Sequence, residues 1–156
     1  MPEISTCDSP QIEAYRLFLK LHRRFQELNR EEFRPYDLST PQYAILFYAT
    51  EEGVPLSYIC NEMLADNSNL TRLVDRLERR GLVRRATDPR DRRVTLVQLT
   101  SAGKALIDEL RPRHRRLVEQ RLSYLSPEEL AAFHQAMQHL YDALQTHQDQ
   151  DNQPIQ

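Results

Sequence analysis

The sequence predicts a mainly α fold that carries one small β-wing, and three observations lead to this prediction. Apolar residues recur at helical spacing along most of the chain, whereas only one segment combines a turn with short β-branched runs. Charged residues make up 28% of the chain and glycine occurs only three times, a composition typical of long solvated helices rather than an all-β fold. A length of 156 residues with 40% hydrophobic content fits one compact core.

The first two helices are predicted from apolar spacing and from a start signal. The first helix has its periodic positions at Ile12, Tyr15, Phe18, Leu19, His22 and Phe25, with Leu17, Leu21 and Leu28 widening the apolar arc. Because the arc is wide, we expect this helix to pack on more than one neighbour. A second helix is predicted to start at Ser39, where a hydroxyl cap precedes proline and Gln42 completes a capping box, to continue through Thr50, and to be ended by Gly53.

Two shorter helices are predicted next. Ser57 is the expected N-cap of a third helix that ends near Ala65. The fourth helix has cap candidates at residues 66–68 and one buried stripe, formed by Leu70, Leu73, Val74 and Leu77. At about 3.6 residues per turn, its remaining surface carries hydrogen-bonding groups. These belong to Asn67, Ser68, Asn69, Thr71, Arg72, Asp75, Arg76 and Arg79.

A β-hairpin is predicted after the fourth helix. Gly81 is the expected left-handed residue that ends the helix, and residues 82–87 and 93–99 are the two expected strands. The segment between them contains aspartate, proline and arginine, which favour a turn. The hairpin is the β-wing of the predicted fold.

Two helices complete the predicted fold. Thr100 or Ser101 caps a fifth helix, in which Pro112 is expected to introduce a kink. The last helix starts at residues 126–129 with a serine cap, a proline and a capping-box acid. Its expected buried positions are Leu130, Phe133, Met137, Leu140, Tyr141 and Leu144. A disordered tail is predicted for residues 148–156.

The net charge of −2 conceals a concentrated positive segment. Between Arg72 and Arg93, nine arginines stand against four acids, which gives +5 and leaves −7 on the rest of the chain. Arginine favours planar, bidentate contacts to phosphate or guanine. A solvated helix face is the alternative interpretation, but the run continues beyond the helix into the turn, where salt-bridge spacing does not explain it. The pattern predicts double-stranded DNA as a partner.

The polar face of the fourth helix contains the residue types that contact bases in the major groove of DNA. The preceding short helix is then expected to cross the groove with Ser57 near a phosphate. An arginine at the tip of the hairpin is expected to enter the minor groove, where narrow width concentrates negative potential. The candidates are Arg90, Arg92 and Arg93.

A family resemblance rests on the run NSNLTRLVDRLERRGLVRRATDPRDRRVTLVQLTSAGKAL. This run resembles the signature of the MarR family of bacterial winged helix-turn-helix regulators, including the LTxxG start of the next helix. The preceding LSTPQYAIL resembles the second helix of that family, so the likeness extends from about Leu38 to Ser126. It implies a homodimer in which the first and last two helices intertwine, and two winged-helix lobes that bind a pseudo-palindromic operator, with repression as the outcome.

The resemblance also implies roles for residues of the hairpin. Asp91, Arg92 and Arg93 match the Asp-x-Arg motif of the family's wing, in which the arginine reaches the minor groove and the aspartate orients it. The resemblance therefore implies that Arg93 reaches the minor groove and that Asp91 orients it. Arg90 is a second candidate for the minor groove.

The predicted domain organisation follows from these elements. Residues 39–99 form the winged helix-turn-helix DNA-binding domain, and residues 1–38 and 100–147 form a helical dimerisation region. Independently of the family, the amphipathic first and last helices suggest a dimer, in which half-sites lie about one helical turn, ~10 bp, apart. The alternative is that both helices complete a monomer core.

A small aromatic acid is the effector that the resemblance implies, bound between the dimerisation helices and the DNA lobes. The candidate lining residues are Phe18, His22, Tyr43, Phe47 and His114, for each of which ordinary packing is the alternative. The resemblance also makes Cys7, just before the first helix, a candidate redox sensor, because some members of the family sense peroxides through a cysteine in that helix; the local sequence ISTCDSP departs from their cysteine motif. Cys60 is expected to be buried and inert.

Other classes of function lack support in the sequence. No nucleophile with a base, glycine-rich phosphate loop or carboxylate cluster suggests an enzyme, and the histidine spacing does not suit zinc, so neither a cofactor nor a metal site is predicted. No stretch resembles a membrane span or a signal peptide, so a soluble cytoplasmic protein is expected. An interaction module without DNA binding leaves the arginines of the hairpin unexplained.

Overall fold

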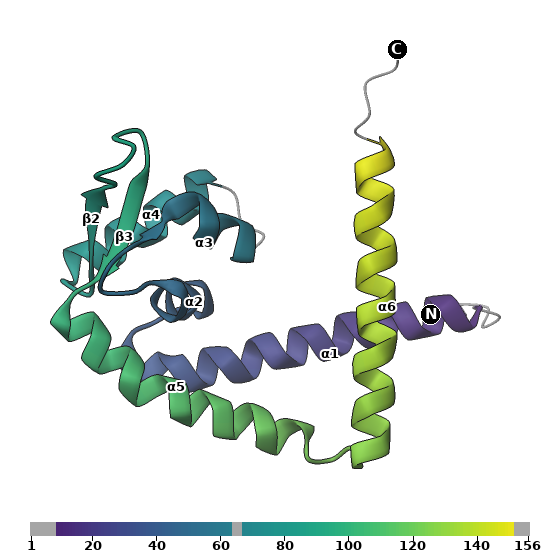
Figure 1. Cartoon of the computed structure of the whole chain (residues 1–156). Helices are drawn as coiled ribbons and strands as arrows, with labels where there is room; N and C mark the ends of the chain where they lie inside the picture. Colours follow the sequence, from purple (N-terminus) through teal and green to yellow (C-terminus); the bar gives the residue numbers. More distant parts are fainter. Residues whose placement is uncertain (1–8, 64–66, 152–156) are drawn as a thin grey trace, which may run out of the picture. The chain divides into compact units, whose positions relative to one another are not determined.

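The structure is a computed structural model that describes residues 9–63 and 67–151. In chain order its elements are α1 (Pro10–Phe33), the 3-10 helix η1 (Arg34–Tyr36), α2 (Thr40–Tyr48), β1 (Val54–Pro55), α3 (Leu56–Met63), α4 (Asn67–Arg79), β2 (Val83–Thr87), β3 (Thr95–Leu99), α5 (Ser101–Leu122) and α6 (Pro127–Asp151) (Figure 1). The predicted mainly α fold with a small sheet is confirmed. The chain divides into two compact units, Met1–Arg111 and Pro112–Gln156.

One hydrophobic core holds the first unit together. Its fully buried side chains come from the end of α1, from α2, α3 and α4, from both long strands and from the start of α5: Phe33, Ile45, Leu46, Ile59, Leu70, Val74, Leu77, Val83, Val97, Ile107 and Leu110. Three of the four predicted stripe residues of α4 are fully buried, and Leu73 packs against the core at its edge. Each fully buried aliphatic side chain contributes roughly 1.5–3 kcal/mol to folding. This core fixes the rotation of α4.

Several helix ends have the caps that the sequence predicts. Ser39 N donates to Gln42 Oε1 at 2.9 Å and Gln42 N donates to Ser39 Oγ, which completes the capping box of α2. Thr100 Oγ1 accepts from Gly103 N at 3.0 Å at the start of α5. Gly81, with φ of 68°, has the left-handed conformation expected after α4.

Gly103 shows why the next helix starts with an LTxxG sequence. A Cβ atom at this position would lie 1.9 Å from the carbonyl oxygen of Leu82, a distance that backbone atoms do not permit. The close approach brings the start of α5 against the residue that precedes β2. Glycine is therefore required for this packing rather than for a turn.

The sheet is antiparallel with strand order β1-β3-β2, so β2 lies at an edge. Val83 pairs with Leu99 and Thr87 with Thr95. β3 starts at Thr95, two residues later than predicted, so the turn of the hairpin is longer than expected. Neither β1 nor η1 was predicted: β1 contains only two residues, and its Pro55 is acceptable because the strand is at the other edge. Figure 1 shows the hairpin projecting beside α4 and beyond it.

Three expected boundaries are wrong. α3 starts at Leu56, so Ser57 lies inside its first turn and does not cap it. α2 ends at Tyr48, several residues before Gly53. α6 continues to Asp151, so residues 148–151 of the expected disordered tail are helical. The last five residues of that tail lie outside the described residues.

The second unit contains the end of α5 and all of α6. Ser126 N donates to Glu129 Oε2 at 2.8 Å and Glu129 N to Ser126 Oγ at 3.2 Å, the predicted capping box. The apolar face of α6 was expected to be buried, but in the single chain it is largely exposed: Leu130, Met137, Leu140, Tyr141 and Leu144. Amphipathic spacing predicts which side chains need cover, not whether the same chain supplies it.

Candidate nucleic-acid interface

The face of α4 opposite the core is a row of exposed polar side chains. Because the buried stripe points inward, the groups on the other side extend into solvent: Ser68, Asn69, Thr71, Arg72, Arg76 and Arg79 are exposed, and Asp75 is half-buried. Asn67 begins the helix, although its side chain lies outside the described part. Ser57 is exposed in the first turn of α3. The structure thus brings most of the predicted DNA-contacting residues to the surface.

The nine arginines of the 72–93 segment include two contrasting groups. Four have exposed side chains with no hydrogen-bond or ion-pair partner among the described residues: Arg72, Arg76, Arg90 and Arg92. Three others contact neighbouring elements of the protein: Arg80, Arg84 and Arg85. Counting charge along the sequence could not separate these groups, since both contain the same residue type.

The wing holds Arg93 in a fixed orientation. Its Nε donates to Asp91 Oδ1 at 3.0 Å and a terminal nitrogen donates to Asp91 Oδ2 at 2.9 Å, while the side chain stays 91% exposed. The Arg93 side chain and backbone N–H hold the pKa of Asp91 below its ordinary value, and Asp91 raises the pKa of Arg93. The side chain is therefore oriented and accessible at once.

The turn of the wing is organised by aspartate side chains. Arg90 N donates to Asp88 Oδ1 at 2.8 Å, and Arg93 N donates to Asp91 Oδ1 at 3.0 Å. These local bonds are the mechanism by which aspartate stabilises turns. They leave the side chains of Arg90 and Arg92 directed to solvent.

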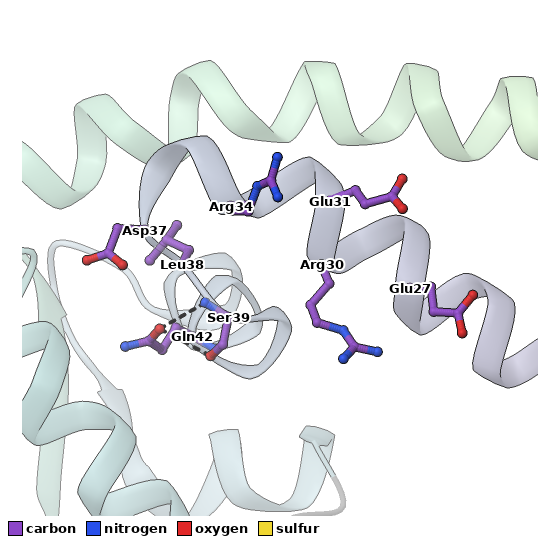
Figure 2. A pocket seen from close by; sticks show the side chains of 8 residues that line it. All are labelled: Glu27, Arg30, Glu31, Arg34, Asp37, Leu38, Ser39 and Gln42. Carbon is purple, nitrogen blue, oxygen red and sulfur yellow. Dashed lines mark hydrogen bonds between the residues drawn. The ribbon is translucent and has the colours of Figure 1, made fainter.

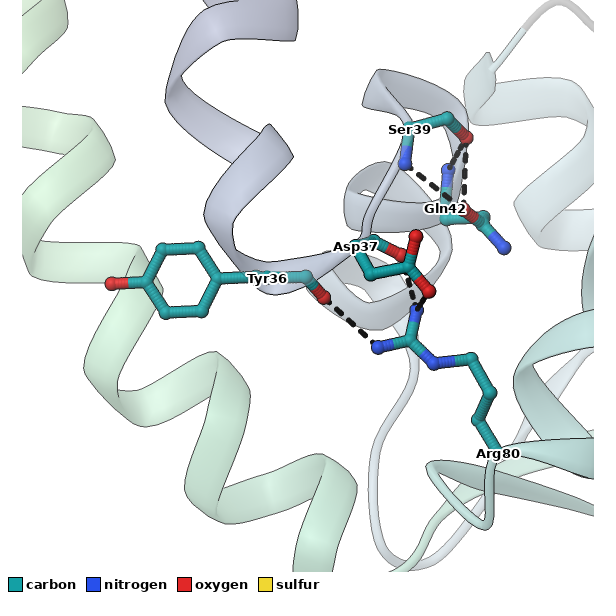
Figure 3. A network of polar contacts seen from close by, with 5 residues as sticks. All are labelled: Tyr36, Asp37, Ser39, Gln42 and Arg80. Carbon is teal, nitrogen blue, oxygen red and sulfur yellow. Dashed lines mark hydrogen bonds and ion pairs between the residues drawn. The ribbon is translucent and has the colours of Figure 1, made fainter.

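The end of α4 is tied to the elbow between α1 and α2. Arg80 donates to the carbonyl oxygen of Tyr36 at 2.9 Å and to that of Asp37, with the Asp37 carboxylate 3.9 Å away (Figure 3). Asp37 is a non-glycine residue in the left-handed region, with φ of 51°. No pattern in the sequence indicated this contact, because its members lie more than forty positions apart.

A hollow of about 640 Å³ lies beside this elbow (Figure 2). It is lined by Glu27, Arg30, Glu31, Arg34, Asp37, Leu38, Ser39 and Gln42. None of the five predicted effector-binding residues belongs to this lining. The hollow contains more charged than aromatic side chains, unlike the aromatic site that the sequence suggested.

The predicted effector-binding residues lie in several environments. Tyr43 is buried and stacks on Phe33 with ring centroids 4.3 Å apart, and burial raises its pKa to about 12. Phe47 is exposed on α2, and its ring centroid lies 6.2 Å from that of Tyr43. The guanidinium carbon of Arg111 lies 4.9 Å from the ring centroid of Phe47. Phe18 and His22 stack on each other on α1. His114 belongs to the second unit.

The remaining predictions concern cysteine, metal and membrane. Cys60 is buried, as expected, whereas Cys7 lies outside the described residues and its redox role stays a prediction. No group of three or more His, Cys, Asp or Glu side chains suited to a metal ion occurs in the described part. No described helix is long and apolar enough to cross a membrane.

A polar helix exposed after a shorter helix, and followed by an arginine-bearing hairpin, defines a winged helix-turn-helix DNA-binding protein. The family model of the MarR family matches residues 36–94. The chain is 30% identical over 122 residues to the HTH-type transcriptional regulator MhqR of Bacillus subtilis, covering 76% of this chain and 84% of MhqR. It is 33% identical over 138 residues to the uncharacterized HTH-type transcriptional regulator YfiV of the same organism, covering 88% and 86%. The chain belongs to the MarR family and is a DNA-binding transcriptional regulator, not an enzyme.

Two solved structures show which ligands similar proteins hold. A mutant of MarR from E. coli, complexed with operator DNA, has a TM-score of 0.73 and 25% identity, covering 83% of this chain and 94% of that one. CouR from Rhodococcus jostii RHA1, bound to p-coumaroyl-CoA, has a TM-score of 0.71 and 27% identity, covering 80% and 88%.

Proposed function

We propose that this protein is a transcriptional repressor that binds a pseudo-palindromic operator as a homodimer and is released by a small molecule. The observation that carries the proposal is that an exposed polar face on α4 and an oriented, exposed arginine on the wing belong to one compact unit. Four arginines of this surface have no partner among the described residues. Exposed, uncompensated guanidiniums are suited to phosphate and base contacts.

The proposed contacts differ between the helix and the wing. In the major groove, base and phosphate contacts come from the α4 residues Asn67, Ser68, Asn69, Thr71, Arg72, Arg76 and Arg79. In the minor groove, Arg93 enters with Asp91 orienting it, and Arg90 and Arg92 flank it. Ser57 is exposed in the first turn of α3, where a hydroxyl at a helix N-terminus suits a phosphate.

Exposed apolar faces support the homodimer. On α1 the exposed large apolar side chains are Ile12, Tyr15, Leu17, Phe18, Leu19 and Leu21, and α6 has a similar set. Exposed large apolar side chains that gather on one helix mark an interaction surface. A second copy is the proposed cover, with residues 1–38 and 100–147 as the dimerisation region and half-sites ~10 bp apart. The two compact units are defined by contacts within one chain, whereas the proposed dimerisation region is defined by contacts between two chains.

The proposed effector is a small aromatic acid. Arg111 above the ring of Phe47 places a cation beside an exposed aromatic surface, which suits a carboxylate attached to a ring. CouR, a similar protein, is bound to p-coumaroyl-CoA, an aromatic acyl thioester. The proposed contacts are Phe18, His22, Tyr43, Phe47 and His114, together with Arg111.

In vitro selection from random duplexes tests the proposed function. We expect enrichment of a sequence with two inverted half-sites, and sedimentation should give two chains per duplex. The matched control is the same selection with an Arg72→Ala, Arg76→Ala double variant, which should enrich no such sequence. Failure of the wild-type protein to enrich any sequence would favour a scaffold without operator recognition.

A thermal-shift screen of aromatic acids tests the effector. A ligand at a hundred times its Kd stabilises the folded state by about 2.7 kcal/mol. We expect a stabilising acid that also releases the selected duplex, and Phe47→Ala should reduce both effects. An acid that releases DNA equally from the Phe47→Ala variant would contradict the proposed site.

A further inference from the structure

Arg85 of β2 joins the wing to the recognition helix. One of its terminal nitrogens lies 2.7 Å from Asp75 Oδ1 and 2.7 Å from Glu78 Oε2, and the other donates to the carbonyl oxygen of Thr71 at 3.1 Å. Residues 71, 75 and 78 follow one line along α4 at i, i+4 and i+7 spacing. A single guanidinium therefore contacts two consecutive turns of the helix.

Glu78 makes a second bond to the same strand residue. Its Oε1 accepts from Arg85 N at 2.9 Å. β2 is an edge strand, so alternate N–H groups of its backbone point away from β3, and the Glu78 carboxylate satisfies one of them. The Arg85 side chain is only 27% exposed, which shields these ion pairs more than fully exposed ones. Backbone and side chain together fix β2 against α4.

The position of this network matters for the surface beside it. Thr71 and Asp75 are the sequence neighbours of Arg72 and Arg76, which point to solvent on the adjacent face. The core holds α4 through its buried stripe, and Arg85 holds the helix from its side through Thr71 and Asp75. We therefore expect loss of the Arg85 contacts to displace α4 slightly, and base contacts are sensitive to such displacement. Two carboxylates at this edge would also repel DNA phosphates if no cation neutralised them.

We infer that Arg85 is a positioning residue for operator selection: it sets α4 against the wing and neutralises Asp75 and Glu78, and it does not contact DNA. This inference rests on the proposed operator binding. It reassigns Asp75, predicted among the DNA-contacting residues, to the support of α4. It also separates Arg85 from the arginines that contact DNA directly.

Two substitutions separate the geometric role from the charge. Arg85→Lys keeps the positive charge, but an ammonium cannot span two carboxylates and a carbonyl as a guanidinium does. We expect it to lower the ratio of operator to random-DNA affinity about tenfold, the loss of one good base contact, with random-DNA affinity unchanged. Arg85→Met should lower both affinities, because Asp75 and Glu78 are then uncompensated. Adding Asp75→Asn and Glu78→Gln should restore random-DNA affinity and leave the ratio low.

Arg84→Lys is the matched control. Arg84 precedes Arg85 on β2, is exposed, and its Nε donates to Gln98 Oε1 at 2.8 Å on the sheet. The same substitution there changes an arginine of the same strand without touching the α4 network. We expect the affinity ratio of this variant to equal that of the wild type. Circular dichroism melts confirm that each compared variant is folded.

The binding titrations use the selected duplex and a scrambled one at several salt concentrations. The salt slope is the slope of the logarithm of the binding constant against the logarithm of the salt concentration. We expect Arg85→Lys to have a lower ratio of operator to random-DNA affinity than the wild type, and the same salt slope. The inference is overturned if Arg85→Lys keeps the wild-type ratio, or if Arg85→Met lowers the salt slope by about 0.9, the mark of a lost phosphate contact. If the wild-type protein binds both duplexes equally, the proposed function is wrong, and the inference is wrong with it. If the wild-type protein prefers the selected duplex and Arg85→Lys keeps that preference, only the inference is wrong.

Discussion

The exposed face of α4 and the wing carry the same kind of side chain but hold it differently. Arg72 and Arg76 extend from α4 with no partner in the described part of the chain, whereas Arg93 is bound at two atoms by Asp91. Ordering a free arginine on binding costs about 0.5–1.5 kcal/mol, a cost that orientation in advance reduces. A free side chain adjusts to a base edge; an oriented one enters a groove of fixed shape. We therefore expect α4 to select sequence and the wing to sense groove width.

The largest effect should come from removing the support that both regions share. Leu77 is fully buried on the core-facing side of α4, so Leu77→Ala is expected to lower the free energy of unfolding by about 2–5 kcal/mol. Because the hairpin packs on the same core, operator and random-DNA binding should fall together. Urea denaturation followed by circular dichroism measures the loss.

Thr95→Ala, at an exposed position of β3, is the control and should change stability by less than about 0.5 kcal/mol. A similarly small change for Leu77→Ala would contradict a shared core.

Arg72→Ala addresses the α4 side of the comparison. We expect a loss of about 1–3 kcal/mol of binding free energy per half-site and a relaxed preference at one base position. Random-DNA affinity should change much less. Titrations against duplexes with each base at that position provide the measurement. If specific and random DNA lose equally, Arg72 contacts a phosphate and the division of labour fails.

Arg93→Ala addresses the wing side and should have a smaller effect on selectivity. Binding to operator and to random DNA should weaken by similar factors, and the salt slope should fall by about 0.9 for each wing that engages. Salt titrations of both duplexes measure this. If Arg93→Ala keeps the salt slope of the wild type but loses base preference, Arg93 reads sequence, which contradicts the role proposed for the wing.

The smallest effect concerns the pH dependence of the wing. Since Arg93 lowers the pKa of Asp91, the pair is fully formed above the ordinary aspartate pKa and is lost only as pH falls through the lowered value. Acid should therefore release Arg93, and pH changes near neutrality should not. Carboxyl NMR of the free protein should give Asp91 a lower midpoint than that of Arg93→Ala. Equal midpoints would mean that Asp91 does not orient Arg93 in solution.

Most features that the sequence predicted correctly depend on residues within one or two helical turns. The capping boxes at Ser39 and Ser126, the left-handed Gly81 and the buried stripe of α4 are of this kind. Their hydrogen bonds and periodicities involve neighbours in the chain, and residue type alone specifies them. The exposed polar face of α4 followed from the same periodicity.

Contacts between distant segments could not be predicted from the sequence. Arg80 bonds to the elbow at Asp37, and Arg85 bonds across to α4, although the charge count of the sequence placed both in one positive segment with the exposed arginines. The two-residue β1 forms only because β3 lies beside it. A guanidinium has the same charge wherever it points, and strand pairing depends on a partner far along the chain. For this reason the sequence alone predicted most of the helices, the hairpin and the polar face of α4, while the fold decides which arginines remain free to bind DNA.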